Sequence, residues 1–275
     1  MKQQRKKSFT TIILILVFII GLSLLLYPSI SDYWNKFHQS RAIVSYIEEV
    51  AEMPDEAYEQ IWQDAISYNE ELAKKGNSWV LTTEEYARYE DMLRISESGV
   101  IGCVEISELD ISLPIYHGTD EKVLQNGAGH VEGSSLPTGG SSTHCVLSGH
   151  RGLPSATLFT NLSEMQEGDT FTLRILDEVL TYKVDQILIV NPKEVSALEI
   201  EEGKDLCTLV TCTPYGINSH RLLVRGYRVA NEDTDSVRII SDAMQIDKLA
   251  VASVIGSMIL LILSIGVMVG LGKRR

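Results

Sequence analysis

The sequence predicts a mainly β protein: a sandwich or a closed barrel of short strands, preceded by a helical segment and flanked by two membrane-spanning helices. Three observations support this prediction. The chain of 275 residues has one uncharged apolar stretch near each end. The residues after the first stretch repeat apolar side chains at helical spacing. After Gly99 the texture changes to short runs rich in β-branched residues.

The first element is an apolar stretch over residues 9–28, FTTIILILVFIIGLSLLLYP, which carries no charge. A hydrocarbon core about 30 Å thick needs roughly 20 apolar helical residues, so this stretch is long enough to span a membrane. A cleaved signal peptide is the alternative, but the stretch is long for that role and no A-x-A-like cleavage site follows it. We therefore expect an uncleaved transmembrane signal-anchor over residues 9–28.

A second uncharged stretch covers residues 249–272. Basic residues lie outside both stretches, as MKQQRKK before the first and GKRR after the second. The positive-inside rule places the two tips, residues 1–8 and 273–275, in the cytoplasm and the section between the spans outside the membrane. The expected localisation is a cell membrane that the chain crosses twice.

The charge of the chain is consistent with an extracytoplasmic section. The formal net charge is −13, and the seven Lys and Arg residues of the two tips contribute +7, which leaves −20 for the remainder. A section this acidic is unsuited to nucleic acid, whose backbone is also negative. We interpret this acidity as that of a solvated surface outside the membrane.

Residues 29–98 have a helical pattern and are expected to form an N-terminal appendage. Two segments, residues 31–53 and 55–75, place aromatic and aliphatic side chains three or four positions apart, with acids between them. Ser31 and Asp55 are candidate N-caps, and Gly76 is a stop signal after the second segment. The apolar stripe is interpreted as a face that packs on the main domain.

Residues 99–230 form the predicted β domain. Turn-forming Gly, Pro, Asp and Asn residues separate the short runs, a pattern typical of a sandwich or a closed barrel. The runs are residues 99–106, 111–118, 143–150, 170–176, 180–190, 206–212 and 220–230. The glycines of GAGHVEG are interpreted as turn residues. A polar linker, residues 231–248, leads to the second span.

The stretch TLVTCTPYGINSHRLLVRG places Cys212 at the end of an apolar run. Because side chains alternate along a strand, Cys212 and Cys207 are expected on opposite faces and not in a disulfide. Seven residues with Pro, Gly and Asn separate Cys212 from His220 and suit a turn. In the resulting hairpin, Arg221 begins the second strand beside Cys212. A guanidinium there favours the nucleophilic thiolate and can meet a developing oxyanion.

A thiol nucleophile also needs a proton donor and acceptor. His220 is expected to face away from its neighbour Arg221, and His38 lies in the helical section. His150 ends a predicted strand inside SGHRG. The two glycines of this stretch allow a backbone conformation that turns the imidazole ring toward a cleft. The residues alone favour His150 and leave three alternatives open, His117, His130 and His144.

The remaining cysteines, Cys103, Cys145 and Cys207, are interpreted as small core residues. Four scattered cysteines are too few for a disulfide scaffold. No C-x-x-C spacing suggests zinc.

The stretch around Cys212 resembles the cysteine–arginine signature of sortases, TLxTC followed by an arginine. Residues 113–162, LPIYHGTDEKVLQNGAGHVEGSSLPTGGSSTHCVLSGHRGLPSATLFTNL, resemble class C, the pilin-polymerising branch, nearly throughout. The similarity extends from about Gly102 to Arg228. Two spans with both ends inside also suit that class. The resemblance implies the closed, eight-stranded sortase-type β-barrel.

The resemblance also implies a role for three residues. Cys212 matches the nucleophile, His150 the general acid and base, and Arg221 the arginine that orients the oxyanion and the substrate. The implied reaction is a transpeptidation, in which Cys212 attacks the Thr–Gly bond of an LPxTG-like sorting signal and forms a thioester. A lysine amine of the next pilin then displaces the enzyme. The implied partners are pilin or surface proteins with such signals, and no metal or organic cofactor is needed.

This sequence departs from class C in one feature. These sortases usually carry an N-terminal lid with an Asp-Pro-aromatic motif over the catalytic cysteine, but the corresponding region reads KKGNSWVLTTEEYARYEDML. Trp79 is the candidate lid residue, because a large amphipathic ring can fill an apolar cleft. The alternative is a tryptophan that packs the helical appendage. Thr211 and Thr213 flank Cys212 and are candidate substrate-binding residues.

Three functions follow as candidates. The first is a pilin-polymerising transpeptidase, and the second is a sortase that attaches surface proteins to cell-wall peptidoglycan precursor, which differs only in the acceptor amine. The third is a catalytically silent membrane scaffold that binds pilins, and the presence of all three active-site residues argues against it. A papain-like hydrolase would place the cysteine before the histidine, and here the order is reversed.

Overall fold

The computed structural model describes residues 2–231, with side chains from residue 13 onward. The predicted linker from residue 232 on, the second span (249–272) and the C-terminal tip (273–275) lie outside the described residues.

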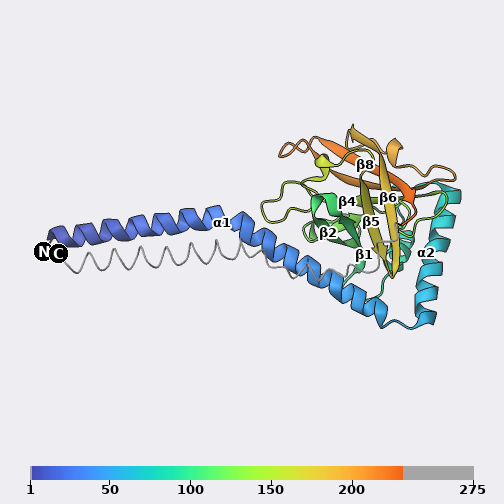
Figure 1. Cartoon of the computed structure of the whole chain (residues 1–275), viewed down its shortest axis with the longest axis horizontal. Coiled ribbons are helices and arrows are strands. Elements are labelled where there is room, and N and C mark those ends of the chain that lie inside the picture. Colours follow the sequence, from blue (N-terminus) through green and yellow to red (C-terminus); the bar gives the residue numbers. More distant parts are fainter. Residues whose placement is uncertain (1, 232–275) are drawn as a thin grey trace. The chain divides into compact units, whose positions relative to one another are not determined.

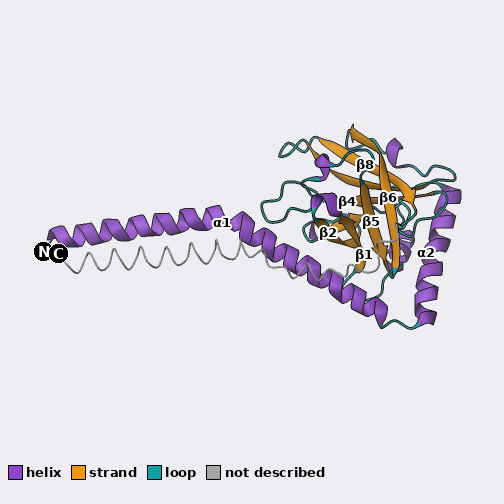
Figure 2. Ribbon diagram, in the orientation of Figure 1, coloured by secondary structure: helices purple, strands orange, loops and turns teal. Residues whose placement is uncertain are grey.

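Eight strands form a closed barrel in the order β1-β2-β3-β4-β7-β8-β6-β5, and antiparallel pairing of β1 with β5 closes the ring. The strands are drawn as arrows in Figures 1 and 2. Of the two predicted architectures, the barrel is therefore confirmed. The strands are β1 (Val100–Ile106), β2 (Ile111–His117), β3 (Ala128–His130), β4 (Thr143–Ser148), β5 (Thr170–Ile175), β6 (Glu178–Val190), β7 (Asp205–Thr213) and β8 (His220–Val229).

Strand β3 is the one that sequence reasoning missed, because it is short and lies in the glycine-rich segment GAGHVEG. It pairs in parallel with β2 and antiparallel with β4. A Cβ atom added at Gly129 would lie 2.2 Å from the carbonyl oxygen of Gly118. The glycine is needed for this close approach of two backbones rather than for a turn.

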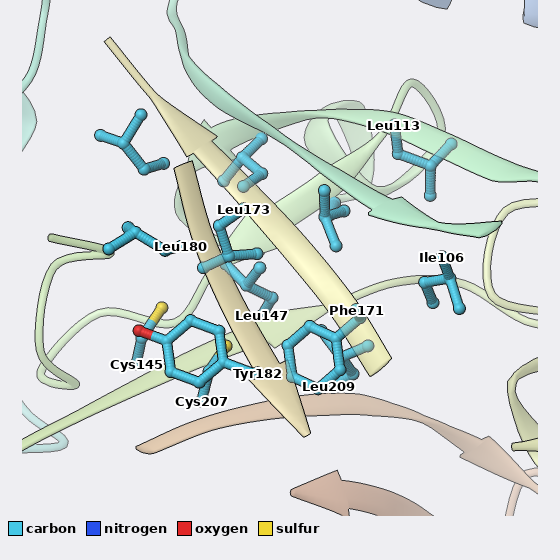
Figure 3. Close-up of a cluster of buried hydrophobic side chains, with 14 of the residues drawn as sticks. Ile106, Leu113, Cys145, Leu147, Phe171, Leu173, Leu180, Tyr182, Cys207 and Leu209 are labelled. Carbon is cyan, nitrogen blue, oxygen red and sulfur yellow. The ribbon is translucent and has the colours of Figure 1, made fainter. Parts of the chain in front are cut away.

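Apolar side chains from all eight strands fill the barrel interior. Figure 3 shows part of this cluster. The rings of Phe171 and Tyr182 stack with centroids 5.6 Å apart. Fully burying a side chain of this kind contributes about 1.5–3 kcal/mol, so the interior is the main source of stability. A second group of buried side chains, which we name the outer cluster, lies on the other face of β4, β7 and β8 and consists of Val146, Leu198, Val210 and Leu223.

Helix α1 (Lys2–Ala51) is continuous, with Pro28 inside it. By length and composition, its segment Ile13–Ala51 is the one helix among the described residues that could cross a membrane, a test that a signal sequence near the N-terminus also passes. Ser31 is an interior residue of α1, so its prediction as an N-cap was wrong. A proline removes one helical hydrogen bond, but the residues on both sides can continue the helix.

The second half of α1 packs on the barrel through β1 and β2. The hydroxyl of Tyr46, which is 1% exposed, donates to the Ile101 carbonyl at 3.0 Å and accepts from the Leu176 N–H at 2.7 Å. The Tyr46 hydroxyl thus links α1 to Ile101 of β1 and to Leu176, the residue just after β5.

Helix α2 (Asp55–Lys75) follows, with Pro54 rather than Asp55 at the N-cap position. Gly76 ends α2 with φ 83°, as predicted, and its N–H donates to the Leu72 carbonyl. A short helix α3 (Thr83–Asp91) starts with a capping box between Thr82 and Glu85. Both helices belong to the segment that the sequence predicted as helical.

Asn69 attaches α2 to the barrel and is 3% exposed. Its Nδ2 donates to the Leu136 carbonyl at 3.0 Å and to Thr138 Oγ1 at 2.8 Å, and its Oδ1 accepts from the Leu136 N–H at 2.8 Å. This side-chain amide therefore satisfies both main-chain groups of one buried residue.

Replacing Asn69 with Ala is expected to lower the free energy of unfolding by about 3 kcal/mol, because two buried main-chain groups lose their partners. Urea denaturation measures the change. Glu70→Ala, on the exposed side of the same helix turn, is the matched control and is expected to change stability little. Equal effects of the two substitutions would contradict the role of Asn69.

Candidate active site

Cys212 and Arg221 are direct partners in the antiparallel pairing of β7 with β8. Residues in this relation lie on one face of the sheet, with Cβ atoms about 4.5–5.5 Å apart. Cys212 is partly exposed, whereas Cys103, Cys145 and Cys207 are buried. The register therefore agrees with the predicted hairpin, in which the arginine lies beside the cysteine.

His150 lies just past the end of β4. Strand β4 pairs in parallel with β7, on the side of β7 that faces away from β8. The last register pair is Ser148 with Val210, and two hydrogen bonds continue beyond it. The Gly149 N–H donates to the Val210 carbonyl at 3.0 Å, and Thr211 Oγ1 donates to the Gly149 carbonyl at 2.7 Å. Continued by two residues, this register places His150 level with Cys212.

The three residues thus come from three neighbouring strands. Cys212 lies on the face of β7 that also carries Val210 of the outer cluster, because side chains alternate and Leu209 points into the interior. The candidate site is therefore on the outside of the barrel wall, at the ends of β4 and β7 and the start of β8.

The His150 ring has a carboxylate partner that sequence reasoning missed. Nε2 of His150 lies 3.2 Å from Oε2 of Glu121, the first residue of the short helix α4 (Glu121–Leu124). Hydrogen bonds from Gln125 and then from His150 lower the pKa of Glu121. A carboxylate at this distance orients the imidazole. The available signal was an acid in GTDE, which the sequence pattern indicated only as a turn.

The alternative histidines lie in the fold with their ring nitrogens occupied or buried. His144 is fully buried, with Nδ1 2.8 Å from the Glu199 carbonyl and Nε2 2.7 Å from Thr208 Oγ1. His130 is also fully buried, between the Tyr89 hydroxyl at 2.9 Å and the Ser135 carbonyl at 2.8 Å. The buried Nε2 of His117 has no hydrogen-bond partner among the described residues. These rings are poorly placed to exchange a proton with substrate.

His117 is expected to make stability depend on pH. Burial, followed by the nearby His130, lowers the pKa of His117 from 6.5 to about 3. The contribution of the neutral ring is therefore present above about pH 6.5 and is lost as the pH falls toward 3. We expect about 2 kcal/mol less stability from this group at pH 5 than at pH 7.

Denaturation of the His117→Gln variant at pH 7 and pH 5 tests this expectation. The variant should lose less stability on acidification than the unsubstituted protein. His38→Gln, in an exposed part of α1, is the control. An equally steep loss in the His117 variant would show that other groups cause the acid sensitivity.

Thr211 and Thr213 flank Cys212, but their side chains lie on the opposite face of β7. Thr211 is 1% exposed and is held by its bond to Gly149. Thr213 accepts a hydrogen bond from Nη1 of Arg151 at 3.2 Å. Both side chains form hydrogen bonds to residues just after β4, Gly149 and Arg151, and so link the end of β4 to β7. A contact with substrate at these two positions would therefore come from the main chain.

Trp79 packs on the outer cluster, which includes Val210, two residues before Cys212 on the same face. Its segment is fixed by Asn77, whose Nδ2 donates to the Gly133 carbonyl at 3.2 Å. Oδ1 of Asn77 accepts from the Ile200 N–H at 2.9 Å. The segment before α3 therefore lies on the outer face near the starts of β4 and β7, at the other end of these strands from Cys212.

A family model described as the sortase domain matches residues 104–229, from within β1 to the end of β8. The structure is similar to sortase C1 of Streptococcus agalactiae, with a TM-score of 0.69 and 50% sequence identity, over 70% of this chain and 100% of that one. It is also similar to sortase C of Clostridium perfringens, solved with a C-terminal cell wall sorting motif. That TM-score is 0.61 at 42% identity, over 69% of this chain and 98% of the other.

Among curated relatives, sortase D of Bacillus subtilis is 32% identical over 131 residues. The matched part is 46% of this chain and 63% of that protein, so the chain spans a little less than two thirds of that relative. The closed eight-stranded barrel and the family match over it define a sortase-type domain. This chain belongs to the sortase family, whose members are cysteine transpeptidases, and the two solved neighbours named above are class C sortases.

Proposed function

We propose that this protein is a membrane-anchored cysteine transpeptidase that joins pilin subunits through their sorting signals. The observation that carries the proposal is the register of β4, β7 and β8. It pairs Cys212 with Arg221, and its continuation two residues past the pair Ser148–Val210 would bring His150 level with Cys212. The similarity to class C sortases supports the choice of pilins as substrates.

The proposed reaction has two halves. Cys212 Sγ, as the thiolate, attacks the threonine carbonyl carbon of an LPxTG-like signal, and the Thr–Gly bond breaks as His150 gives its proton to the leaving glycine amine. The product is a thioester between Cys212 and the threonine. A lysine amine of another pilin then attacks the thioester and loses a proton to His150, and the new amide bond forms as the thiolate leaves. Free enzyme is regenerated.

Arg221 is the proposed donor to the oxyanion in both halves. Its Nη1 donates to the carbonyls of Asn218 at 3.3 Å and His220 at 3.1 Å, which hold the guanidinium at the start of β8. The remaining N–H groups are available for the tetrahedral intermediate, and donors fixed in advance require no reorganisation during the reaction. Glu121, which contacts the His150 ring, is the proposed positioning residue for the acid and base.

The proposed location follows from the two apolar stretches, residues 9–28 and 249–272. The apolar part of α1 would anchor the protein, and the predicted second span would return the chain to the cytoplasm. The appendage (29–98) and the catalytic domain (99–230) would then face the outside, where secreted pilins are available. This topology and these boundaries are part of the proposal.

The experiment incubates the full chain in detergent with a pilin subunit that carries an LPxTG-like tail, and separately with the same tail and a cell-wall precursor amine. Covalently linked pilins support pilin polymerisation. Transfer only to the wall precursor would favour the second candidate, a wall-anchoring sortase. Binding of pilin without cleavage by folded protein would favour a scaffold and would contradict both enzymatic functions.

We further propose that Trp79 packs the helical appendage on the barrel, the alternative to a lid over Cys212. Trp79 lines a pocket with Ser142 and Glu202, which lie just before β4 and β7, whereas Cys212 lies near the other end of β7. Trp79→Ala should therefore leave the rate at which a small thiol reagent labels Cys212 unchanged. Mass spectrometry of the labelled peptide gives the rate, and Val80→Ala, whose side chain is 85% exposed, is the neighbouring control. A several-fold faster rate in Trp79→Ala alone would restore the lid function.

A further inference from the structure

Cys145 and Cys207 face each other inside the barrel. They are register partners in the parallel pairing of β4 with β7. They are 2% and 0% exposed, and both belong to the interior core. Figure 3 shows their side chains close together beside the ring of Tyr182.

The spacing of this pair suits a covalent bond between the sulfurs. Neighbouring strands lie about 4.7–4.9 Å apart, and disulfides join residues whose Cα atoms are about 4.4–6.8 Å apart. Both thiols are free in this structure. Their strands are central in the barrel wall and hold the two sulfurs at one level.

The other two cysteines cannot compete for this pairing. Cys212 lies on the opposite face of β7, as the alternation of side chains requires. Cys103 lies on β1, where its register partners are Pro114 and Arg174. The pair is therefore specified by the fold, although the sequence alone gives no reason to connect these two residues.

The reduced pair places ionisable groups in an apolar interior. Burial, together with a hydrogen bond to Cys145, raises the pKa of the Cys207 thiol far above its usual value. Burial also opposes ionisation of Cys145, but hydrogen bonds from Cys207 and His130 lower the pKa of Cys145 below its ordinary value. A disulfide would replace these two ionisable thiols with one group that cannot ionise.

We propose that Cys145 and Cys207 form a disulfide when the protein folds in an oxidising environment, which rests on the proposed location outside the membrane. The two thiols give up two protons and two electrons to a low-molecular-weight disulfide or to a disulfide-bearing thiol oxidoreductase, which becomes two thiols. Because both sulfurs are buried in the native fold, the exchange takes place before the barrel closes.

The bridge would stabilise the candidate active site from the opposite face. Cys145 on β4 precedes His150, just past the end of that strand, by five residues, and Cys207 precedes Cys212 by five residues on β7. A covalent link between β4 and β7 would keep these two strands in register. It would also close a loop of about 60 residues, long enough for a large effect on the unfolded chain.

The test uses the full chain with Cys212→Ala, exported to an oxidising compartment, so that the outcome does not depend on transpeptidase activity. The protein is denatured and alkylated without a reductant, then digested and analysed by mass spectrometry. We expect Cys103 to be alkylated and Cys145 to be linked to Cys207. Before alkylation, the intact mass of the exported protein should be about 2 Da lower than that of the reduced protein. Alkylation of all three thiols in the folded, exported protein would overturn the proposal.

A second measurement is the midpoint of thermal unfolding with and without a reductant. Reduction is expected to lower the midpoint by roughly 10 °C, and the Cys145→Ala, Cys207→Ala double variant should not respond. Cys103→Ala, which removes another buried thiol, should keep the full response. If the double variant does not fold, the alkylation pattern still decides, and a midpoint that ignores the reductant in the parent protein would count against the bridge.

Discussion

Replacing Cys212 with Ala is expected to abolish both cleavage of the sorting signal and joining of pilins, with a loss of at least about 10³-fold. The reason is that both halves of the proposed reaction pass through the sulfur, so no partial activity can bypass it. The substitution should leave the fold intact, because Cys212 is partly exposed on the outer face of β7. Rates are measured by release of the glycine-bearing fragment and by gel analysis of linked pilins.

Cys103→Ala is the matched control for this experiment, since it removes a buried thiol from another strand. It should retain activity in proportion to the folded protein. Substantial cleavage by Cys212→Ala, at more than a few per cent of the parent rate, would contradict the covalent route. Circular dichroism of both variants separates loss of chemistry from loss of fold.

Arg221→Ala is expected to lower kcat/KM by about 10²–10³-fold, the loss typical of removing a fixed donor to an oxyanion. The direct pairing of Arg221 with Cys212 is the structural basis, since it places the two residues side by side on one face of the sheet. Arg221→Lys should recover only part of the loss, because an ammonium is a point charge that lacks the planar fork of donors. Single-turnover rates of thioester formation check both variants.

Lys193→Ala, in the exposed loop after β6, is the control for removal of a positive charge and is expected to leave kcat/KM nearly unchanged. A similar loss in both variants would mean that Arg221 acts through general surface charge. Full activity of Arg221→Ala would exclude it from the oxyanion site.

Much of the barrel could be predicted from the sequence, because strand periodicity and turn residues are local signals. The hairpin of β7 and β8 is the best example, since its turn residues and alternation also predicted the pairing of Cys212 with Arg221. The short strand β3 was missed because three residues with two small side chains carry no period. The continuous helix through Pro28 was missed because a proline is an ambiguous stop signal.

The parallel pairing of β4 with β7 could not be predicted, because the two strands are far apart in the sequence and no turn connects them. Two features of the site depend on that pairing. One is the level of His150 relative to Cys212, and the other is the contact between Cys145 and Cys207. The carboxylate of Glu121 was hidden for a similar reason, since its partner lies 29 positions further along the chain.

The most direct test of the central claim is to trap the acyl-enzyme. The full chain is mixed with a peptide that carries an LPxTG-like signal, quenched in acid without an acceptor amine, and analysed by intact mass and by peptide mapping. We expect an adduct that ends at the threonine and maps to Cys212, and none when Cys212 is replaced by Ala. An adduct on another residue, or cleavage of the peptide by the Cys212→Ala variant, would contradict the proposed site.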